Sequence, residues 1–457
     1  MAKKKQIELT IEEKLQNALV PKEEQPYKIP NNWCWVRLES INKYKSETLN
    51  PKNAMEKMFE LYSVPSFDNK YPEILIGKDI GSNKYIVKKN DILLCKINPR
   101  INRVWQVYQH TNFGQICSSE WIVIRNEILN KSFLRYYFTS EYFRNRLCEN
   151  VSGVGGSLTR AKPKLVQLYE VPLSPINEQQ RIVNIIESLF AKLDRAKELI
   201  ENTLAQFEQN KMAILHKAFI GELTAKWRKE NNIDLSSWEN GILMDFCKIN
   251  PKKINTKEFD DDMIVSFIPM PCVSDIWGKI VKKELRKLGE VKKGYTNFCE
   301  GDVLFAKITP CMENGKSAIV DKLENDIGFG STEFYVLRCD ENKLNNKYLH
   351  YFVRQKTFRD EAKGEMTGAV GQQRVPKTFL ENYKMKVPTL EEQQEIVNIL
   401  DKLLAKYNKI KNLEQQLEKI ELLKKAILAK AFRGELGTNN PDEESAENLL
   451  KEILAEK

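Results

Sequence analysis

Basic and amide side chains occupy matched positions in the two halves of this 457-residue sequence. After two similar apolar runs, "NDILLCKINPR" and "GDVLFAKITP", the chain carries Lys96, Arg100, Lys307 and Thr309. Two later glycine-containing segments, "GGSLTRAKPK" and "GQQRVPK", add Ser157, Thr159, Arg160, Lys162, Lys164, Gln372, Gln373, Arg374 and Lys377. Arg and Gln can pair bidentately with guanine and adenine edges, and Lys suits phosphate groups. The pattern favours loops that contact DNA, although solvated loop charge explains any single one of these residues equally well.

Signatures of catalysis and of metal binding are absent from the sequence. The three histidines have no partner at ligand spacing, and the nine cysteines stand singly without a C-x-x-C pair, which favours reduced thiols. "INPR" and "INPK" lack the second Pro and the aromatic residue of the N-P-P-[YF] motif that holds a flipped adenine in amino-methyltransferases. No G-x-x-x-x-G-K-[ST] phosphate loop occurs, and "VSGVGGS" matches a dinucleotide site only weakly. We expect no catalytic residue, metal or cofactor in this chain, and a chance nuclease-like trio of acidic residues and Lys is the remaining alternative.

The composition indicates a soluble globular protein with room for more than one domain. It is 42% hydrophobic and 30% charged, and its formal charge of +9 is spread along the chain. Diffuse positive charge of this size fits a nucleic-acid partner and a merely solvated surface about equally well. No apolar run approaches the roughly 18 residues that cross a bilayer, and the carboxylates of "QIELTIEEKL" exclude a signal-peptide core. We therefore expect a cytoplasmic protein without a membrane partner.

The elements that position these loops occur twice. "NEQQRIVNIIESLFAKLDRAKELI" begins at Asn177, and "EEQQEIVNILDKLLAKYNKIKNLE" begins at Glu391. The repeat extends forward to "KAFIGEL" and "KAFRGEL", and backward to "SSE" at Ser118 and "STE" at Ser331. The long helical segments match closely, whereas residues 27–175 and 226–388 share little beyond anchor points. The repeat predicts two half-proteins in tandem, with a common scaffold that carries two different specificities.

Apolar residues in the repeated segments alternate in steps of three and four, as Ile182, Ile186, Leu189 and Leu193 show. This is the narrow seam of a coiled coil, and it continues without Pro or Gly as far as Gly221 and Gly434. Since a long seam needs a partner, we predict that the two helices pair antiparallel and separate two globular halves that are related by pseudo-two-fold symmetry. The alternative is that each helix packs separately on its own domain as core.

The segments between the helices have a mixed α/β (α+β) character. β-rich runs such as "DILLCKI" and "EFYVLRC" alternate with "KSFLRYYFTSEYFRNRL" and "NKYLHYFVRQKTFRDEA", which have helical spacing and aromatic residues typical of a core. "TIEE" at Thr10 is a capping box, and Asn440 and Pro441 suit the cap and the first position of a tail helix. "ELT" occurs at Glu8 and again at Glu222. The repeat is therefore predicted to be circular, with the N-terminal segment supplying what the second copy lacks at its end.

Over essentially its whole length the chain resembles the specificity subunit of type I restriction-modification systems. The resemblance is carried by "YKIPNNWCWVRL", "VPLSPINEQQRIV", "VPTLEEQQEIV", "KAFIGEL", "KAFRGEL" and "PDEESAENLLKEI". It implies a bacterial, non-catalytic DNA-binding subunit with two target-recognition domains, each of which recognises one half of a bipartite asymmetric site. The long helices would set the spacing and dock two methyltransferase subunits, with restriction subunits added outside. S-adenosylmethionine, ATP and magnesium would then be bound by these partners, whose complex has DNA adenine methyltransferase and ATP-dependent endonuclease activity.

The repeat and the resemblance together predict six segments. They are an N-terminal helical cap (1–26), target-recognition domain 1 (27–175), spacer helix 1 (176–225), target-recognition domain 2 (226–388), spacer helix 2 (389–436) and a C-terminal tail helix (437–457). The start of the second recognition domain departs from the family pattern, because Trp238 in "LSSWENGILMDF" has no Pro before it. Two other functions stay open: the DNA-recognition half of a single-chain restriction-methylation enzyme, and a structural coiled-coil adaptor.

Overall fold

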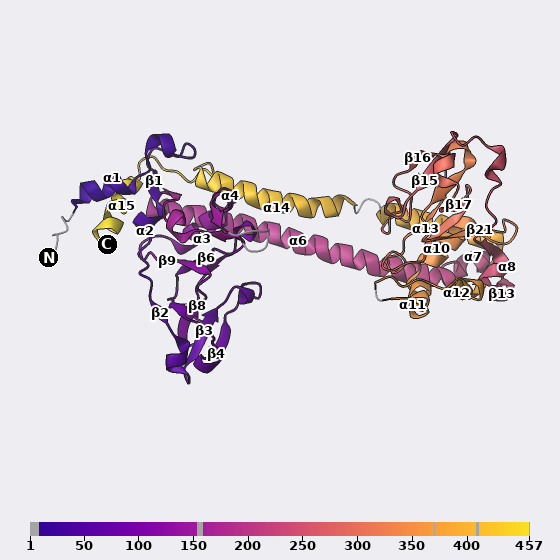
Figure 1. The fold of residues 1–457 in the computed structure, drawn as a ribbon, viewed down its shortest axis with the longest axis horizontal. Helices are drawn as coiled ribbons and strands as arrows, with labels where there is room; N and C mark the ends of the chain where they lie inside the picture. The colour runs from indigo at the N-terminus through magenta and orange to yellow at the C-terminus, as the bar shows by residue number, and fades with distance from the viewer. Residues whose placement is uncertain (1–8, 153–158, 370, 408–410, 457) are drawn as a thin grey trace. The chain divides into compact units, whose positions relative to one another are not determined.

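A computed structural model describes residues 9–152, 159–369, 371–407 and 411–456 of the chain (Figure 1). The chain forms two compact units, and each has its own hydrophobic core. Unit 1 comprises Met1–Leu199 and Gln415–Lys457, and unit 2 comprises Ile200–Glu414. Both units combine short strands with helices, so the mixed α/β fold predicted from the sequence is confirmed. Because the first and last parts of the chain share unit 1, the structure agrees with a circular repeat.

Unit 1 contains two main sheets, formed by short β-branched and aromatic runs. One has the strand order β2 (Thr48–Leu49), β5 (Lys84–Ile86), β8 (Gly114–Cys117), β3 (Met58–Tyr62) and β4 (Glu73–Ile76). The other has the order β7 (Val104–Gln106), β6 (Ile92–Cys95) and β9 (Trp121–Ile124). Two antiparallel pairs complete the strands, β1 (Cys34–Arg37) with β12 (Glu170–Leu173) and β10 (Val151–Ser152) with β11 (Arg160–Ala161).

The helices of unit 1 come from both ends of the chain. The first part of the chain supplies α1 (Ile11–Ala18), α2 (Leu38–Ile41), α3 (Lys131–Thr139), α4 (Glu141–Glu149) and α5 (Pro163–Val166). The last part supplies α15 (Ala446–Ala455). Ala18 at the end of α1 and Leu450 and Ile453 of α15 are buried in the same core cluster. The N-terminal and C-terminal helices therefore stabilise one domain jointly.

Unit 2 repeats this plan with different strands. Its larger sheets have the orders β14 (Cys247–Ile249), β21 (Phe334–Cys339), β18 (Val303–Ala306), β19 (Ser317–Ile319), and β16 (Glu284–Lys287), β15 (Ile264–Ile268), β20 (Gly328–Gly330), β17 (Thr296–Phe298). A further antiparallel pair joins β13 (Glu239–Ile242) to β22 (Lys384–Val387). Its short helices are α7 (Ala225–Glu230), α8 (Leu243–Phe246), α9 (Leu288–Val291), α10 (Asn346–Arg354), α11 (Lys356–Gly364) and α12 (Lys377–Glu381). The parallel pair β15–β20 corresponds to β3–β8 of unit 1, and β13–β22 corresponds to β1–β12.

The long helices are α6 (Ile176–Phe219), which has 44 residues, and α13 (Leu390–Tyr407) followed by α14 (Lys411–Phe432). Ile182, Val183 and Ile186 of α6 are buried in unit 1, whereas Leu215 and Ala218 of the same helix are buried in unit 2. Within unit 1, Lys197 of α6 pairs with Glu421 of α14, and Asp194 pairs with Lys424. The partner numbers rise on one helix as they fall on the other, so this pairing is antiparallel, as predicted. The alternative is also partly correct, because the ends of the helices are core elements.

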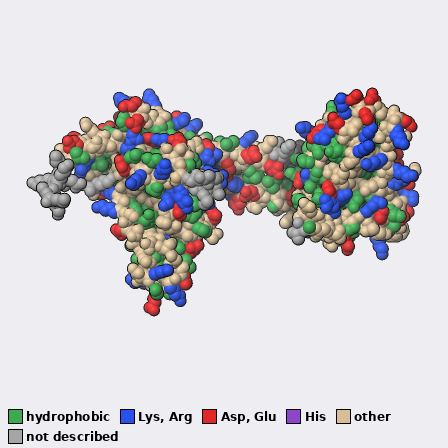
Figure 2. Space-filling view, in the orientation of Figure 1, with side chains coloured by type: hydrophobic (Ala, Val, Ile, Leu, Met, Phe, Trp, Pro, Cys, Tyr) green, Lys and Arg blue, Asp and Glu red, His purple; other side chains and the backbone are tan. Residues whose placement is uncertain are grey.

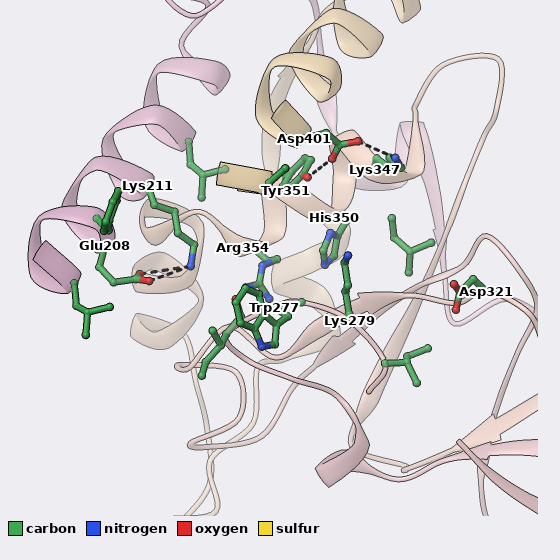
Figure 3. Close-up of a pocket in the computed structure, with 18 of the residues that line it drawn as sticks. Glu208, Lys211, Trp277, Lys279, Asp321, Lys347, His350, Tyr351, Arg354 and Asp401 are labelled. Atoms are coloured by element: carbon green, nitrogen blue, oxygen red, sulfur yellow. Dashed lines mark hydrogen bonds and ion pairs between the residues drawn. The ribbon is translucent and has the colours of Figure 1, made fainter. Parts of the chain in front are cut away.

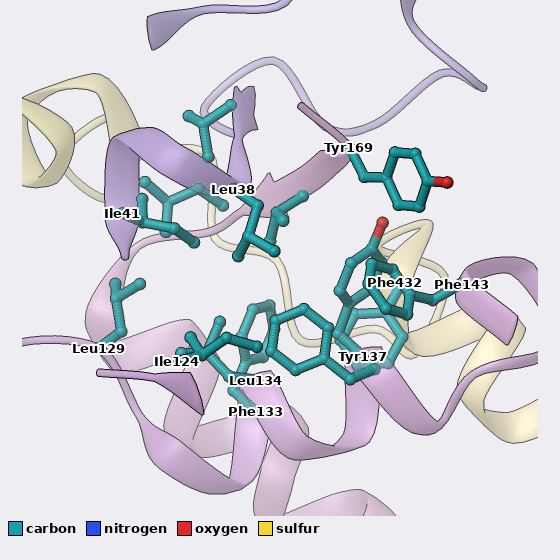
Figure 4. Packing of buried hydrophobic residues seen from close by; sticks show 14 of the residues in the cluster. Leu38, Ile41, Ile124, Leu129, Phe133, Leu134, Tyr137, Phe143, Tyr169 and Phe432 are labelled. Carbon is teal, nitrogen blue, oxygen red and sulfur yellow. The ribbon is translucent and has the colours of Figure 1, made fainter. Parts of the chain in front are cut away.

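Each helix of the repeat ends in the "KAF" motif, whose Phe enters an aromatic cluster. In unit 1 the ring of Phe432 lies 5.3 Å from that of Phe133 and 5.2 Å from that of Tyr137, measured between centroids (Figure 4). In unit 2 the ring of Phe219 lies 5.2 Å from the rings of both Tyr348 and Phe352. Aromatic pairs at this separation stabilise a core beyond their burial. The aromatic helices noted in the sequence are therefore the sites to which the long helices attach.

Two local predictions about the terminal helices had different outcomes. Thr10 caps α1 in a capping box with Glu13, as predicted. The prediction that Asn440 and Pro441 begin the tail helix is wrong, because α15 begins at Ala446 and Ser445 is its cap. The side chain of Asn440 instead accepts a hydrogen bond from Asp442 N at 3.2 Å in a short turn before the helix, and its backbone carbonyl accepts one from Asn32.

Candidate nucleic-acid interface

The two predicted loop segments lie side by side in each unit. In unit 1, Asn98 N donates to the carbonyl of Thr159 at 2.8 Å, and Ala161 N donates to the carbonyl of Lys96 at 2.8 Å. In unit 2, Thr309 N donates to the carbonyl of Gln373 at 3.0 Å, and Val375 N donates to that of Lys307 at 2.9 Å. The loop after β6 or β18 is thus joined by backbone hydrogen bonds to the later segment. The segments that match between the two halves of the sequence therefore occupy equivalent positions in the two units.

The matched arginines of these segments each pair with a matched glutamate. Arg160 Nε lies 3.3 Å from a carboxylate oxygen of Glu120, and Arg374 binds Glu333 through Nε at 2.9 Å and Nη2 at 2.8 Å. Hydrogen bonding to Arg374 lowers the pKa of Glu333, so that carboxylate stays ionised. Both arginines are still exposed at the surface. Sequence reasoning missed these partners, although the repeated "SSE" and "STE" contain them.

The other candidates have varied surroundings. Arg100, Lys162, Lys164 and Gln372 are exposed, and Lys96, Thr159, Lys307, Thr309 and Gln373 are partly buried. Arg100 sits on a 3₁₀ turn, Pro99–Ile101, between Asn98 and Asn102, both of which adopt the left-handed conformation that Asn tolerates. Lys377 forms an ion pair with Glu381 across one turn of α12. Ser157 lies outside the described residues.

An ion pair between an arginine and a buried aspartate supports the strand before each loop. Arg125 binds Asp91 through Nε at 2.7 Å and Nη2 at 2.6 Å, and Arg338 binds Asp302 in the same way at 2.7 and 2.8 Å. Both aspartates are buried and also accept a backbone N–H. Bidentate Arg–carboxylate pairs fix geometry as well as charge. The strands β6 and β18 are thereby held in the same way in the two units.

The repeated "EQQ" motif joins each domain to its long helix. Glu178 accepts hydrogen bonds from Trp33, Thr438 and Asn439, and Glu392 accepts them from Trp238, Thr224 and Arg228. The next residue, Gln179 or Gln393, accepts from the backbone N–H of Asn130 or Asn345, which are the N-caps of α3 and α10. The repeated "EQQ" residues therefore have a structural role, because they hold each domain against its long helix. Sequence reasoning did not find this role, although the exact recurrence of three polar residues was its signal.

Lys and Arg side chains are distributed over the displayed faces of both units, between Asp and Glu side chains (Figure 2). The charge is therefore diffuse, as the sequence predicts, and the matched loops are distinguished by their geometry and not by a dense basic patch. Such an arrangement suits contacts with phosphates and base edges at a few defined positions.

Comparison with known families decides the class of the chain. The type I restriction modification DNA specificity domain matches residues 30–206 and again residues 236–422. The chain belongs to this family. It carries two specificity domains, and the matched loops, the Asp–Arg pairs and the "EQQ" junctions occur once in each.

Related proteins with assigned roles are specificity subunits. The chain is 34% identical over 262 residues to the type I restriction enzyme EcoEI specificity subunit of Escherichia coli, a match that covers 48% of this chain and 44% of that relative. It is 25% identical over 413 residues to the EcoKI specificity subunit of Escherichia coli strain K12, covering 84% of each chain. The first match thus spans less than half the length of the relative, and the second spans most of it.

Solved structures show the same fold. A chain from a type I R-M system, described for its complex assembly and conformational transition, is similar with a TM-score of 0.70 and 21% identity, over 90% of this chain and 100% of that one. The HsdS subunit from Thermoanaerobacter tengcongensis is similar with a TM-score of 0.57 and 22% identity, over the same shares of the two chains. The specificity-domain fold is therefore shared at low sequence identity.

Unit 2 of this specificity-domain protein also contains a pocket of about 640 Å³, lined by α6, α10, α13 and the loop 276–280 (Figure 3). Several of its polar groups bind one another: Asp401 accepts from Tyr351 and Lys347, and Lys211 lies 3.5 Å from Glu208. Burial lowers the pKa of His350 to about 3, aided by the nearby Arg354, so its ring is neutral. These contacts are those of a structural cluster.

Among the described residues, no group of three or more His, Cys, Asp or Glu side chains could hold a metal ion. All nine cysteines are free thiols, and most are buried. No helix in the described part of the chain is long and apolar enough to span a membrane.

Proposed function

We propose that this chain is the DNA specificity subunit of a type I restriction-modification complex, in which each unit recognises one half of a bipartite asymmetric DNA site. One observation carries the proposal: two specificity domains share the same Asp–Arg ion pairs and the same loop-to-loop hydrogen bonds, while residues 27–175 and 226–388 otherwise have largely different sequences. A common scaffold with different loops suits a target whose two halves have different sequences.

The long helices are proposed to set the spacing between the recognition domains and to dock two methyltransferase subunits, with restriction subunits added outside. Exposed apolar side chains on α14, Leu422 and Leu423, support a protein partner on this helix. We propose that S-adenosylmethionine, ATP and magnesium are bound by these partners and that this chain takes no part in the chemical steps. A cytoplasmic location stays a prediction.

Methylation mapping tests the proposed function. The full chain is expressed with a methyltransferase subunit from the same host, and modified adenines are mapped by long-read sequencing. We expect one bipartite motif with a fixed spacer, and no methylation when either chain is omitted. Methylation by the chain alone would favour a single-chain enzyme, and an unchanged pattern without the chain would favour a structural adaptor.

DNA binding by the same complex should weaken steeply as salt rises, because phosphate contacts release counterions. A gel-shift titration at several salt concentrations, with and without the methyltransferase subunit, measures this slope.

A further inference from the structure

The loop between β7 and β8 of unit 1, residues 107–113, is held by a buried carboxylate on the neighbouring strand β3. Glu60 is fully buried, and its Oε1 accepts hydrogen bonds from His110 N at 3.0 Å, from Thr111 N and from Thr111 Oγ1 at 2.7 Å. Its Oε2 accepts from Gln115 Nε2 at 2.9 Å. Burial alone would raise the pKa of Glu60, but the hydrogen bonds outweigh it and lower the pKa. Both oxygens of the buried Glu60 carboxylate therefore accept hydrogen bonds, and these bonds fix the backbone of the loop.

A second side chain of β3 fixes the start of the same loop. The hydroxyl of Tyr62 donates to the carbonyl of Tyr108 and accepts from Tyr108 N at 3.1 Å. Gln115 Nε2 also donates to the carbonyl of Tyr108 at 2.7 Å. The loop conformation is thus determined from below by β3 and β8, while the side chains of Tyr108, His110 and Phe113 are exposed above it.

The exposed side chains form an aromatic surface beside positive charge. The rings of Tyr71 and His110 lie 4.6 Å apart between centroids, and Tyr71 is 48% exposed. Lys70 precedes Tyr71 in the chain. Burial lowers the pKa of Lys70, and so does the positive charge of Arg103, whereas the negative charge of Asp68 raises it. Arg103 in turn accepts a backbone hydrogen bond from Cys95, next to the candidate Lys96. Lys70 is thus the chain neighbour of Tyr71, and the backbone of Arg103 lies beside the strand that leads into the loop predicted to contact DNA.

Unit 2 has the same fold without a buried carboxylate at the position of Glu60. In the parallel pairs β3–β8 and β15–β20, Glu60 corresponds to Ser266 and Gln115 to Gly328. Ser266 Oγ there accepts one hydrogen bond, from Glu324 N at 2.8 Å. The equivalent loop, 320–327 ("VDKLENDI"), carries four charged side chains among its eight residues and no aromatic ring. The loops at this position therefore carry different side chains in the two units. The Arg160–Glu120 and Arg374–Glu333 ion pairs, in contrast, occur at matching positions in both units.

We propose that the loop 107–113, together with Tyr71, distinguishes the base sequence of the half-site bound by unit 1, with His110 as a specificity-determining residue and Glu60 as its positioning residue. The imidazole of His110 can donate to or accept from base edges in a groove, and the exposed rings can contact a thymine methyl group. The matched Arg–Glu pairs belong to the common scaffold, because an element that is identical in both domains does not distinguish different half-sites. This inference rests on the proposed function.

Selection from a pool of randomised DNA duplexes tests the proposal with the full chain assembled with its methyltransferase subunits. We expect His110→Ala to reduce preference at one or two base pairs of one half-site by about 5- to 150-fold, and to leave the other half-site unchanged. Glu60→Ser, which introduces the residue of unit 2, should broaden preference at the same base pairs. Leu168→Ala removes an exposed apolar side chain elsewhere in unit 1 and serves as the control.

The outcomes separate this inference from the proposed function. If the wild-type complex selects no bipartite sequence, the proposed function fails and the inference fails with it. If the wild-type complex selects two half-sites and His110→Ala selects the same two with the same affinity, only the inference is overturned. It is also overturned if His110→Ala weakens binding equally for every sequence, or abolishes assembly with the methyltransferase while base preference is unchanged.

Discussion

Glu178 and Glu392 show how a single residue attaches a recognition domain to a long helix. Each is buried near the start of its helix and binds a Trp indole N–H at 2.7 or 2.9 Å. The two sites differ in charge, because Glu392 also pairs with the buried Arg228, whereas Glu178 accepts from the neutral donors Thr438 and Asn439. A buried ion pair is costly to break from one side, since the remaining charge stays buried.

Replacing Glu392 with Ala should therefore lower the free energy of unfolding by about 3–5 kcal/mol, because Arg228 is left without a carboxylate. Glu178→Ala should cost about 1–3 kcal/mol, since it leaves only neutral donors unpaired. Urea unfolding followed by Trp fluorescence measures both, with the exposed neighbour Glu391→Ala as control. Equal losses at the two positions would contradict the assignment of the ion pair.

His350 makes the stability of unit 2 dependent on pH. Its pKa in the folded state, about 3, lies below the ordinary value of 6.5 because the ring is buried, so the unfolded chain binds more protons between these values. The stability that the neutral ring contributes is complete above pH 6.5 and is lost as the pH falls towards 3.

Between about pH 7.5 and pH 5, the unfolding free energy of His350→Gln should fall by about 2 kcal/mol less than that of the wild type. Denaturant unfolding at a series of pH values checks this difference. The exposed His216→Gln is the matched control and should follow the wild type. A variant slope equal to the wild-type slope would show that His350 is not the group responsible.

At the scale of elements, each long helix belongs to both domains. The start of α6 packs in unit 1 and its end packs in unit 2, where Phe219 enters the aromatic cluster of α10. In unit 1 that place is taken by Phe432 of α14. The apolar period and the repeat predicted the helices, and the aromatic helical segments predicted where cores form, because both signals are local in the sequence.

Other elements depended on contacts between distant residues and could not be predicted. The tail helix begins later than its local signal at Asn440, because that residue starts a separate turn, whose first carbonyl accepts a hydrogen bond from Asn32 far away in the chain. The partners of Arg160 and Arg374 were not found for the same reason, since Glu120 and Glu333 lie about 40 residues earlier. The Glu60-supported loop was also missed, because an alternating strand with one Glu does not indicate whether that side chain faces solvent or a loop.

The length of the helices can be tested as a determinant of spacing. Adding one heptad after Leu193 and one after Tyr407 preserves the apolar seam, because the register returns to phase. The added rise of about 10.5 Å corresponds to about three base pairs, which rotate the duplex by about 100°. We expect unchanged half-sites with either a longer spacer or a large loss of binding, measured by gel shift on a series of spacers. A folded, assembled variant that prefers the original spacer with full affinity would contradict this role of the helices.

At the scale of the whole molecule, the chain is two copies of one domain with exchanged helix ends. Unit 1 takes its core from the beginning of the chain, from α6, and from α14 and α15 at the end. Unit 2 takes its core from the residues between Ile200 and Glu414. The matched ion pairs and junctions make the two domains structurally alike, and their unlike loops give each a different surface.

The central claim is that the two units recognise their half-sites independently, and exchange of one domain tests it most directly. Residues 27–175 are replaced by the equivalent segment of another specificity subunit, and the methylated motif of the hybrid complex is mapped by long-read sequencing, with the unaltered chain as control. We predict that one half-site changes to that of the donor while the other half-site and the spacer stay the same. A change in both half-sites together would contradict independent recognition by two domains on a common scaffold.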